Sequence, residues 1–126
     1  MTPLKKKSTK EIGRIGEDIA VQYLEEKGFT VLDRNYNFEH GEIDIVAYQG
    51  RFIVFVEVKT RSSASYGEPE MAIDSKKRQQ LLLVAEAWMH ERRMTGAPAR
   101  FDVIAIMRPQ TSREEIRHYE EAFWYM

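Results

Sequence analysis

The sequence of 126 residues contains no cysteine. Disulfide bonds and thiolate zinc sites are therefore excluded, which suits a reducing cytoplasm. The chain also has no apolar run long enough to span a bilayer, and its basic start, MTPLKKKSTKE, is not followed by the apolar stretch of a signal peptide. We therefore expect a cytoplasmic protein without a membrane anchor.

A strong excess of positive charge is also absent, because the formal net charge is −1. This argues against a protein that coats DNA, since such proteins are usually basic overall. Basic residues are nevertheless clustered, at Lys5, Lys6, Lys7 and Lys10 and again at Lys76, Lys77 and Arg78. The composition therefore still allows local contact with a nucleic-acid backbone.

The length and a hydrophobic content of 43% are those of one globular domain. We assign residues 1–126 to a single domain, with 1–7 as a flexible basic tail. Apolar spacing predicts helices from about residue 8 to 28 and from about 74 to 93. Strands are expected at residues 29–36, 42–48, 52–60, 100–107 and 116–125. This order predicts an α/β fold with a mixed five-stranded sheet, in which the first three strands are antiparallel and the second helix connects a parallel pair.

The stretch GEIDIVAYQGRFIVFVEVKTR, residues 41–61, predicts a β-hairpin that carries charged side chains on one face. With Gln49-Gly50 as a two-residue turn, Asp44 would pair with Phe55. Side chains alternate along each strand, so one face carries Glu42, Asp44, Glu57 and Lys59. A slip of one residue in the register would separate Asp44 from Glu57.

Glu57 and Lys59 end a strand that is otherwise mostly apolar. Charges in such a place are costly unless they are paired or bound to something, so two interpretations stay open. One is a structural ion pair between Glu57 and Lys59. The other is a metal site, because Mg²⁺ prefers carboxylate oxygens and keeps several waters. In the second case Asp44 and Glu57 are the ligands, and Lys59 orients a water molecule.

Asp44 is followed, after twelve residues, by Glu57-Val58-Lys59. This arrangement resembles the PD-(D/E)xK nuclease signature, with Ile43 in place of the proline. Four segments further resemble the YraN family of small bacterial predicted endonucleases: GRIGEDIAVQYLEEKGF, RNYNFEHGEIDIVA, FVEVKTRSSASYGEP and RFDVIAI. That resemblance covers most of the chain. It implies a restriction-endonuclease-like three-layer α/β/α sandwich, similar to that of archaeal Holliday-junction resolvases. It also implies that Glu17, otherwise a solvated acid on the first helix, completes the site.

The hypothesis that combines these features is a Mg²⁺-dependent endonuclease, with Mn²⁺ as a substitute, that hydrolyses phosphodiester bonds in DNA, including branched or structured DNA. Asp44 and Glu57 hold the metal, and Lys59 and Glu17 are catalytic. Candidate contacts to the nucleic acid are Arg34, Asn35, Arg61, Tyr66, Lys76 and Gln80. For several of these, ordinary turn, connector or solvated helix positions are equally good explanations.

Two other functions stay open on the sequence. One is a nuclease-fold protein that binds nucleic acid or a protein partner without cutting. The other is an RNA-directed enzyme, which no aromatic RNA-recognition motif supports. Two assemblies also stay open. The aromatic end Phe123, Trp124 and Tyr125 could form the contact of a homodimer, or it could close the core of a monomer.

Overall fold

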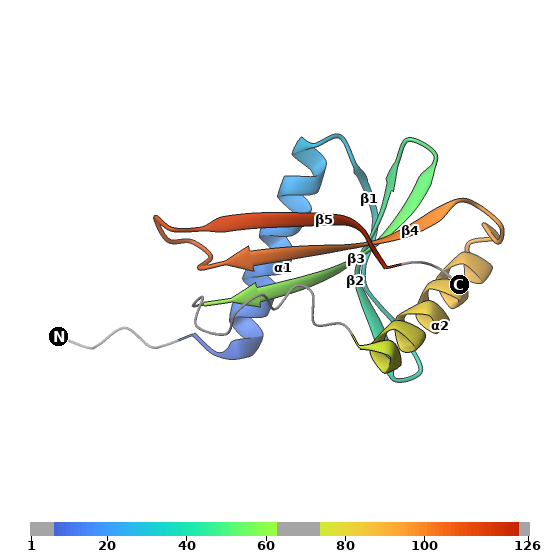
Figure 1. Ribbon diagram of the computed structural model, residues 1–126, viewed down its shortest axis with the longest axis horizontal. Coiled ribbons are helices and arrows are strands. Elements are labelled where there is room, and N and C mark those ends of the chain that lie inside the picture. The colour runs from blue at the N-terminus through green and yellow to red at the C-terminus, as the bar shows by residue number, and fades with distance from the viewer. Residues whose placement is uncertain (1–6, 63–73, 124–126) are drawn as a thin grey trace.

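Residues 7–62 and 74–123, which the computed structural model describes, form two helices and five strands (Figure 1). In chain order these are α1 Thr9–Glu26, β1 Thr30–Phe38, β2 Gly41–Gln49, β3 Phe52–Arg61, α2 Ser75–Glu91, β4 Ala99–Met107 and β5 Glu115–Phe123. The predicted order of elements is confirmed, and the boundaries differ by only a few residues. No helix in the described part of the chain is both long and apolar enough to cross a membrane.

The helices begin where the sequence supplies capping side chains. Ser8 Oγ accepts a hydrogen bond from the Glu11 backbone N–H at 3.2 Å, and Asp74 Oδ1 accepts one from the Lys77 backbone N–H at 2.8 Å. Each bond satisfies a backbone donor that the first helical turn leaves without a partner. These caps fix where both helices begin.

The five strands form one mixed sheet in the order β1-β2-β3-β4-β5. The pairs β1–β2, β2–β3 and β4–β5 are antiparallel, whereas β3 and β4 are parallel and are connected through α2. The predicted mixed five-stranded sheet and its antiparallel meander are therefore confirmed.

The turn between β2 and β3 differs from the prediction. Gln49 pairs with Phe52, so the turn is Gly50-Arg51 rather than Gln49-Gly50, and the predicted pairing of Asp44 with Phe55 is wrong. Gly50 has φ +61°, a conformation that glycine adopts without strain at the first central position of a type II′ turn. The register moves by two residues, an even number, so the shift alone does not exchange the two faces of the paired strands. Alternation in β2 is nevertheless interrupted at Asp44, because Ile43 packs in the cluster of α2 whereas Ile45 packs in that of α1.

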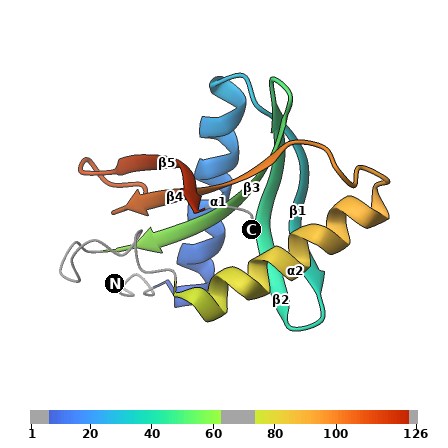
Figure 2. The same cartoon turned by 45° about the vertical axis from the view of Figure 1, so that its right-hand side comes forward.

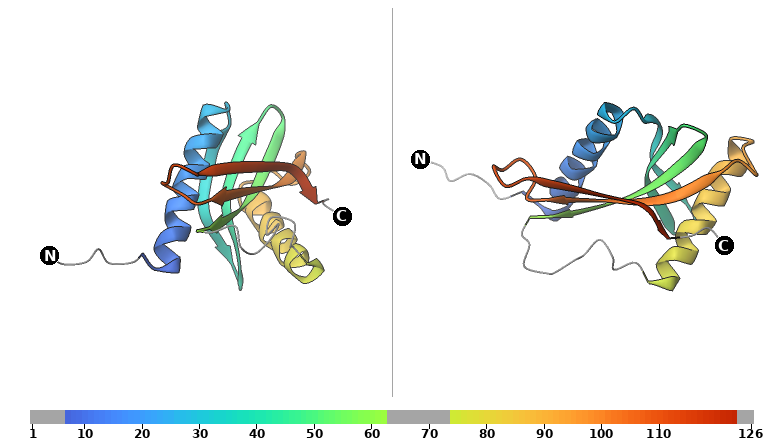
Figure 3. Two further views of the ribbon diagram at one scale, coloured as in Figure 1. Left: turned by 60° about the vertical axis from the view of Figure 1, so that its left-hand side comes forward. Right: turned by 45° about the horizontal axis from the view of Figure 1, so that its top comes forward.

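The helices cover opposite faces of the sheet (Figures 2 and 3). Alternate residues of β3 point to the two sides, with Val54 and Val56 packed in the cluster that contains Ala20 and Leu24 of α1. Their neighbours Ile53 and Phe55 belong instead to the cluster of α2, which also contains Leu81, Val84, Ala85 and Trp88. The sheet is therefore buried between two helices along its central strand.

Asp102 of β4 is the charged residue that the described core buries completely. Its Oδ1 accepts hydrogen bonds from Arg100 Nε at 3.1 Å and from the Glu121 backbone N–H at 3.1 Å. Its Oδ2 lies 2.7 Å from His118 Nε2. These partners account for the buried charge, so Asp102 has a structural role apart from the acidic residues of β2 and β3.

The two glycines on α1 face different surroundings. A Cβ atom on Gly16 would lie 1.9 Å from Thr60 Oγ1 and 2.9 Å from Thr60 Cβ, whereas one on Gly13 would meet nothing within 4 Å. We therefore expect Gly16→Ala to push α1 away from β3 and to lower the free energy of unfolding by about 1–2 kcal/mol. Urea unfolding followed by circular dichroism measures this change.

Gly13→Ala is the matched control, because it places the same methyl group one turn away on the same helix. It should raise the free energy of unfolding by up to about 1 kcal/mol through helix propensity alone. If Gly16→Ala were as stable as Gly13→Ala, the close approach of α1 to Thr60 would not be a packing constraint.

Candidate functional site

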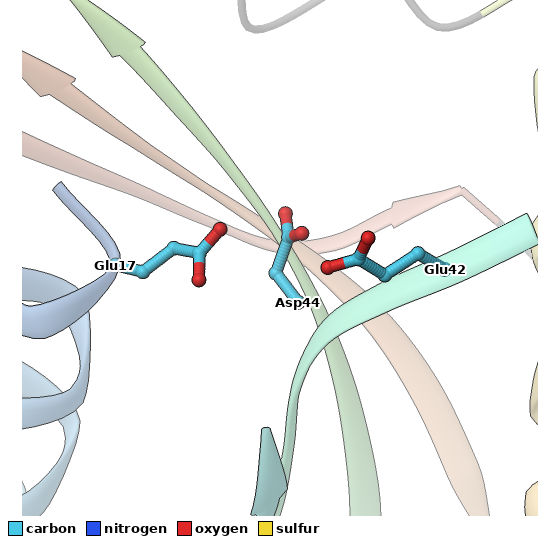
Figure 4. A group of neighbouring side chains, drawn as sticks. All are labelled: Glu17, Glu42 and Asp44. Carbon is cyan, nitrogen blue, oxygen red and sulfur yellow. The ribbon is translucent and has the colours of Figure 1, made fainter. Parts of the chain in front are cut away.

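Strands β2 and β3 part at the position of the predicted site. Their ladder ends at the pair Ile45–Val56, whereas β3 continues beside β4 as far as Arg61, opposite Met107. Asp44 and Glu57 are the next residues after the last β2–β3 pair. They lie where the two strands diverge, an opening that we call the fork, and Figure 4 shows Asp44 there.

The side chain of Asp44 reaches from β2 across the fork to the backbone of β3. Its Oδ2 atom accepts a hydrogen bond from the Val58 backbone N–H at 2.8 Å. This bond satisfies a backbone donor that β2 no longer reaches after the strands part. It also anchors the carboxylate of Asp44 to the strand that carries Glu57, and the two residues line one cavity.

Three carboxylates from two elements converge at this point. Oxygen atoms of Glu17 on α1 and of Glu42 and Asp44 on β2 all lie within 4.8 Å of one another. Figure 4 shows their side chains directed toward a common centre. A cavity of about 480 Å³ opens beside them, lined by residues that include Glu17, Asp44, Glu57 and Lys59. The four residues predicted as metal-binding or catalytic thus line one cavity. The carboxylates within 4.8 Å of one another, however, include Glu42 and not the predicted ligand Glu57.

Asn35 connects two of the carboxylates. Its Nδ2 atom donates a hydrogen bond to Glu17 Oε1 and another to Glu42 Oε1, each at 2.8 Å. Asn35 has φ +51°, a left-handed conformation in which asparagine is enriched among residues other than glycine. The sequence predicted Asn35 as a contact to nucleic acid. In this structure its amide joins α1 and β2 at the cluster, and this geometry does not test the predicted contact.

The structure places the other predicted contacts in different surroundings. Arg61 lines the same cavity, and Gln80 donates a hydrogen bond to the His40 carbonyl oxygen at 3.0 Å. Arg34 forms an ion pair with Asp18 at 2.7 Å, and Lys76 is exposed on the first turn of α2. Tyr66 lies outside the described residues. None of these geometries tests a contact with DNA.

Lys77, the neighbour of the predicted Lys76, forms an ion pair with Glu57. Its Nζ atom is 3.9 Å from Glu57 Oε1, and the Glu57 side chain is only 14% exposed. Lys76 and Gln80 were predicted as contacts to nucleic acid because they share one helical face. The position of Lys77 depends on how α2 packs against β3, which spacing within the helix does not give.

The electrostatics of the fork disfavour negative charge. Burial, together with the negative charge of Glu57, raises the pKa of Asp44 to about 8, although the Val58 N–H acts in the opposite direction. Burial also raises the pKa of Glu57, and the positive charges of Lys77 and Lys59 offset part of that rise. A divalent cation would reverse this balance by stabilising both carboxylates in their ionised form. The donor set, oxygen atoms of clustered carboxylates, is the one that Mg²⁺ and Mn²⁺ prefer.

Comparison with known proteins places this cluster inside a matched region. The model of the uncharacterised protein family UPF0102 matches residues 16–106, a span that includes Glu17, Asp44, Glu57 and Lys59. A UPF0102 protein from Geotalea daltonii is 44% identical over 118 residues, which cover 94% of this chain and 93% of the relative. A UPF0102 protein from Geobacter metallireducens is 46% identical over 114 residues, covering 90% and 93%. One from Rhodococcus opacus is 40% identical over 112 residues, covering 89% and 95%.

Proposed function

We propose that this chain, which belongs to the uncharacterised protein family UPF0102, is a metal-dependent endonuclease that hydrolyses phosphodiester bonds in DNA. One observation carries the proposal: Glu17, Asp44, Glu57 and Lys59 line a single cavity at the fork between two strands. A mixed sheet between two helices also agrees with the restriction-endonuclease-like fold that the sequence resemblance implies. Clustered carboxylates beside a lysine are suited to binding a hard cation and stabilising a negatively charged phosphate.

In this proposal Asp44 and Glu57 would hold Mg²⁺, or Mn²⁺ in its place. When bound, the ion would neutralise charge on a phosphate oxygen and lower the pKa of a coordinated water. Lys59 contributes a positive charge and a hydrogen-bond donor toward the negative charge that develops on the phosphate. Glu17 accepts a hydrogen bond from a water molecule in the cavity, and Asn35 holds the Glu17 carboxylate in place.

A second candidate function is binding of nucleic acid or of a protein partner without cleavage. The observation in its favour is the net charge of −1, which is low for a protein that must attract DNA. A homodimer remains a prediction as well. The aromatic residues Trp124 and Tyr125, proposed as its contact, lie outside the described residues.

The direct test is a cleavage screen with Mg²⁺ and with Mn²⁺ on duplex, flap, four-way junction and single-stranded DNA. We expect cleavage of at least one of these substrates, and we expect Glu57→Gln to reduce its rate by about 10²-fold or more through loss of a metal ligand. Asp18→Asn is the matched control, because Asp18 is an exposed acid beside Glu17 that pairs with Arg34 outside the cluster.

Equal cleavage by wild type and Glu57→Gln would assign the activity to a contaminant and reject the proposal. Binding of a DNA substrate without cleavage under either metal would favour the non-catalytic alternative.

A further inference from the structure

Strands β3, β4 and β5 continue past the fork as a three-stranded arm (Figures 1 and 3). The free end of this arm consists of the end of β3 and the turn between β4 and β5, residues 108–114. The start of α1 lies against it, because Lys7 Nζ donates a hydrogen bond to Gln110 Oε1 at 3.1 Å. Basic side chains are concentrated here, and we call them the basic rim: Lys7, Lys10, Arg61, Arg108 and Arg113.

The basic rim is continuous with the cavity beside Glu17, Glu42 and Asp44, the three carboxylates that we call the acidic cluster. Arg61 lines that cavity together with Glu57, and the Arg108 backbone N–H donates a hydrogen bond to the Arg61 carbonyl oxygen at 2.7 Å. A strand rises about 3.3 Å per residue, so Arg61 lies roughly 13 Å along β3 from Glu57. The turn that carries Arg108 and Arg113 lies at and beyond this distance.

The acidic residues at this end of the arm have local partners. Glu114 Oε1 accepts a hydrogen bond from the Gln110 backbone N–H at 2.7 Å, and Glu115 pairs with Arg108 at 3.7 Å and with Arg117. Lys7 contacts a neutral amide, and Arg113 and Lys10 are exposed. The first turn of α1 adds one exposed acid, Glu11. The five basic residues of the rim still outnumber Glu11, Glu114 and Glu115 on this surface of a protein whose overall charge is −1.

A DNA strand that enters the fork meets a cluster of carboxylates, which repel its phosphates wherever a bound cation does not offset their charge. Binding therefore needs attraction from elsewhere, and the nearby basic rim can supply it. Phosphates follow one another every 3.4 Å of helix axis along each strand of duplex DNA. A distance of about 13 Å along β3 thus corresponds to about four base pairs from the phosphate at the cluster.

We infer that the basic rim is a docking surface for the phosphate backbone of a DNA duplex arm, about four or more base pairs from the phosphate held at the acidic cluster. The inference rests on the proposed function for the position of that phosphate. It deepens the proposal by naming the surface and the part of the substrate that it holds.

The test compares two triple variants that remove the same total charge. One replaces Lys7, Lys10 and Arg113 with glutamine. Its matched control replaces Lys27, Arg51 and Arg93, which lie at the end of α1, in the β2–β3 turn and after α2. Binding of a labelled duplex is measured by fluorescence anisotropy across a salt series with Ca²⁺, so that binding is read apart from Mg²⁺-dependent cleavage. Circular dichroism confirms that both variants are folded.

The logarithm of the binding constant falls with the logarithm of salt concentration by about 0.9 for each phosphate contact to duplex DNA. We expect the rim variant to flatten this slope by about 2–3 and the control to leave it nearly unchanged. The single variant Arg113→Gln should flatten it by about 0.9. A duplex too short to extend about four base pairs from the acidic cluster should lose more affinity for wild type than for the rim variant, which keeps only Arg61 and Arg108 of the rim.

Equal slopes for the rim variant and its control would overturn the inference, as would failure of the wild type to bind duplex DNA. If wild type cleaved DNA but the rim variant and its control had equal slopes, the proposed function would stand and the role of the basic rim would be rejected. If the rim variant flattened the slope but wild type cleaved no substrate with Mg²⁺ or Mn²⁺, the nuclease proposal would be rejected. The basic rim would then stand as a DNA-binding surface.

Discussion

Asp44→Asn is expected to abolish binding of Mn²⁺ while making the metal-free protein more stable at alkaline pH. The asparagine side chain keeps an oxygen that can accept the hydrogen bond that Val58 N–H now donates to Asp44. It removes the charge that a hard cation needs in its ligand. It also removes the cost of an ionised carboxylate in the fork.

The pH dependence of this gain follows from the pKa of Asp44. Its usual value is 3.8, and burial with the nearby Glu57 charge raises it to about 8 in the folded protein. Between these values the folded state keeps a proton that the unfolded chain has released. The stability of the metal-free protein therefore falls as the pH rises from about 4 to about 8. Asp44→Asn should match wild type near pH 4 and exceed it by about 2 kcal/mol or more at pH 8.

Urea unfolding in EDTA at pH 4 to 8 measures the stability change, and calorimetry with Mn²⁺ measures binding. Asp18→Asn is the control, since Asp18 is exposed and its ion pair with Arg34 contributes little to stability. Equal Mn²⁺ binding by wild type and Asp44→Asn would remove Asp44 from the metal site. A variant less stable than wild type at pH 8 would show that the carboxylate does not destabilise the fork.

Much of the fold could be predicted because local patterns decide it. Ser8 and Asp74 mark the helix starts, and apolar alternation marks the strands. The turn was misplaced by one residue because glycine suits both candidate pairs, Gln49-Gly50 and Gly50-Arg51. Asp44 and Glu57 still line one cavity, since the resulting register shift is an even number of residues.

The parts of the site that sequence reasoning missed depend on contacts between distant elements. The bridging role of Asn35 requires a left-handed backbone in β1 and the nearby carboxylates of α1 and β2. Glu42 was placed on the charged face, but its proximity to Glu17 depends on how α1 packs. One signal was available for Asn35: asparagine tolerates positive φ, so its place inside a predicted strand marks an irregularity.

Lys59→Ala is expected to reduce cleavage by about 10²-fold or more while leaving metal binding largely intact. Lys59 lines the cavity between the acidic cluster and Arg61, so its charge can reach a phosphate held there. A donor aimed at charge that develops during the reaction lowers the barrier without being a metal ligand. Single-turnover cleavage rates with Mg²⁺ and calorimetry with Mn²⁺ separate these two effects.

Lys77→Ala provides the comparison that tests whether position matters more than charge. Both lysines lower the pKa of Glu57, and Lys77 has the larger effect. If the lysines acted only by offsetting the carboxylates, Lys77→Ala would reduce cleavage at least as strongly as Lys59→Ala. The proposal requires the opposite order, with a loss of about tenfold or less for Lys77→Ala. Two outcomes would assign Lys59 to charge balance instead of catalysis. One is a larger loss of cleavage rate in Lys77→Ala than in Lys59→Ala. The other is a weakening of Mn²⁺ binding in Lys59→Ala that accounts for its whole loss of cleavage rate.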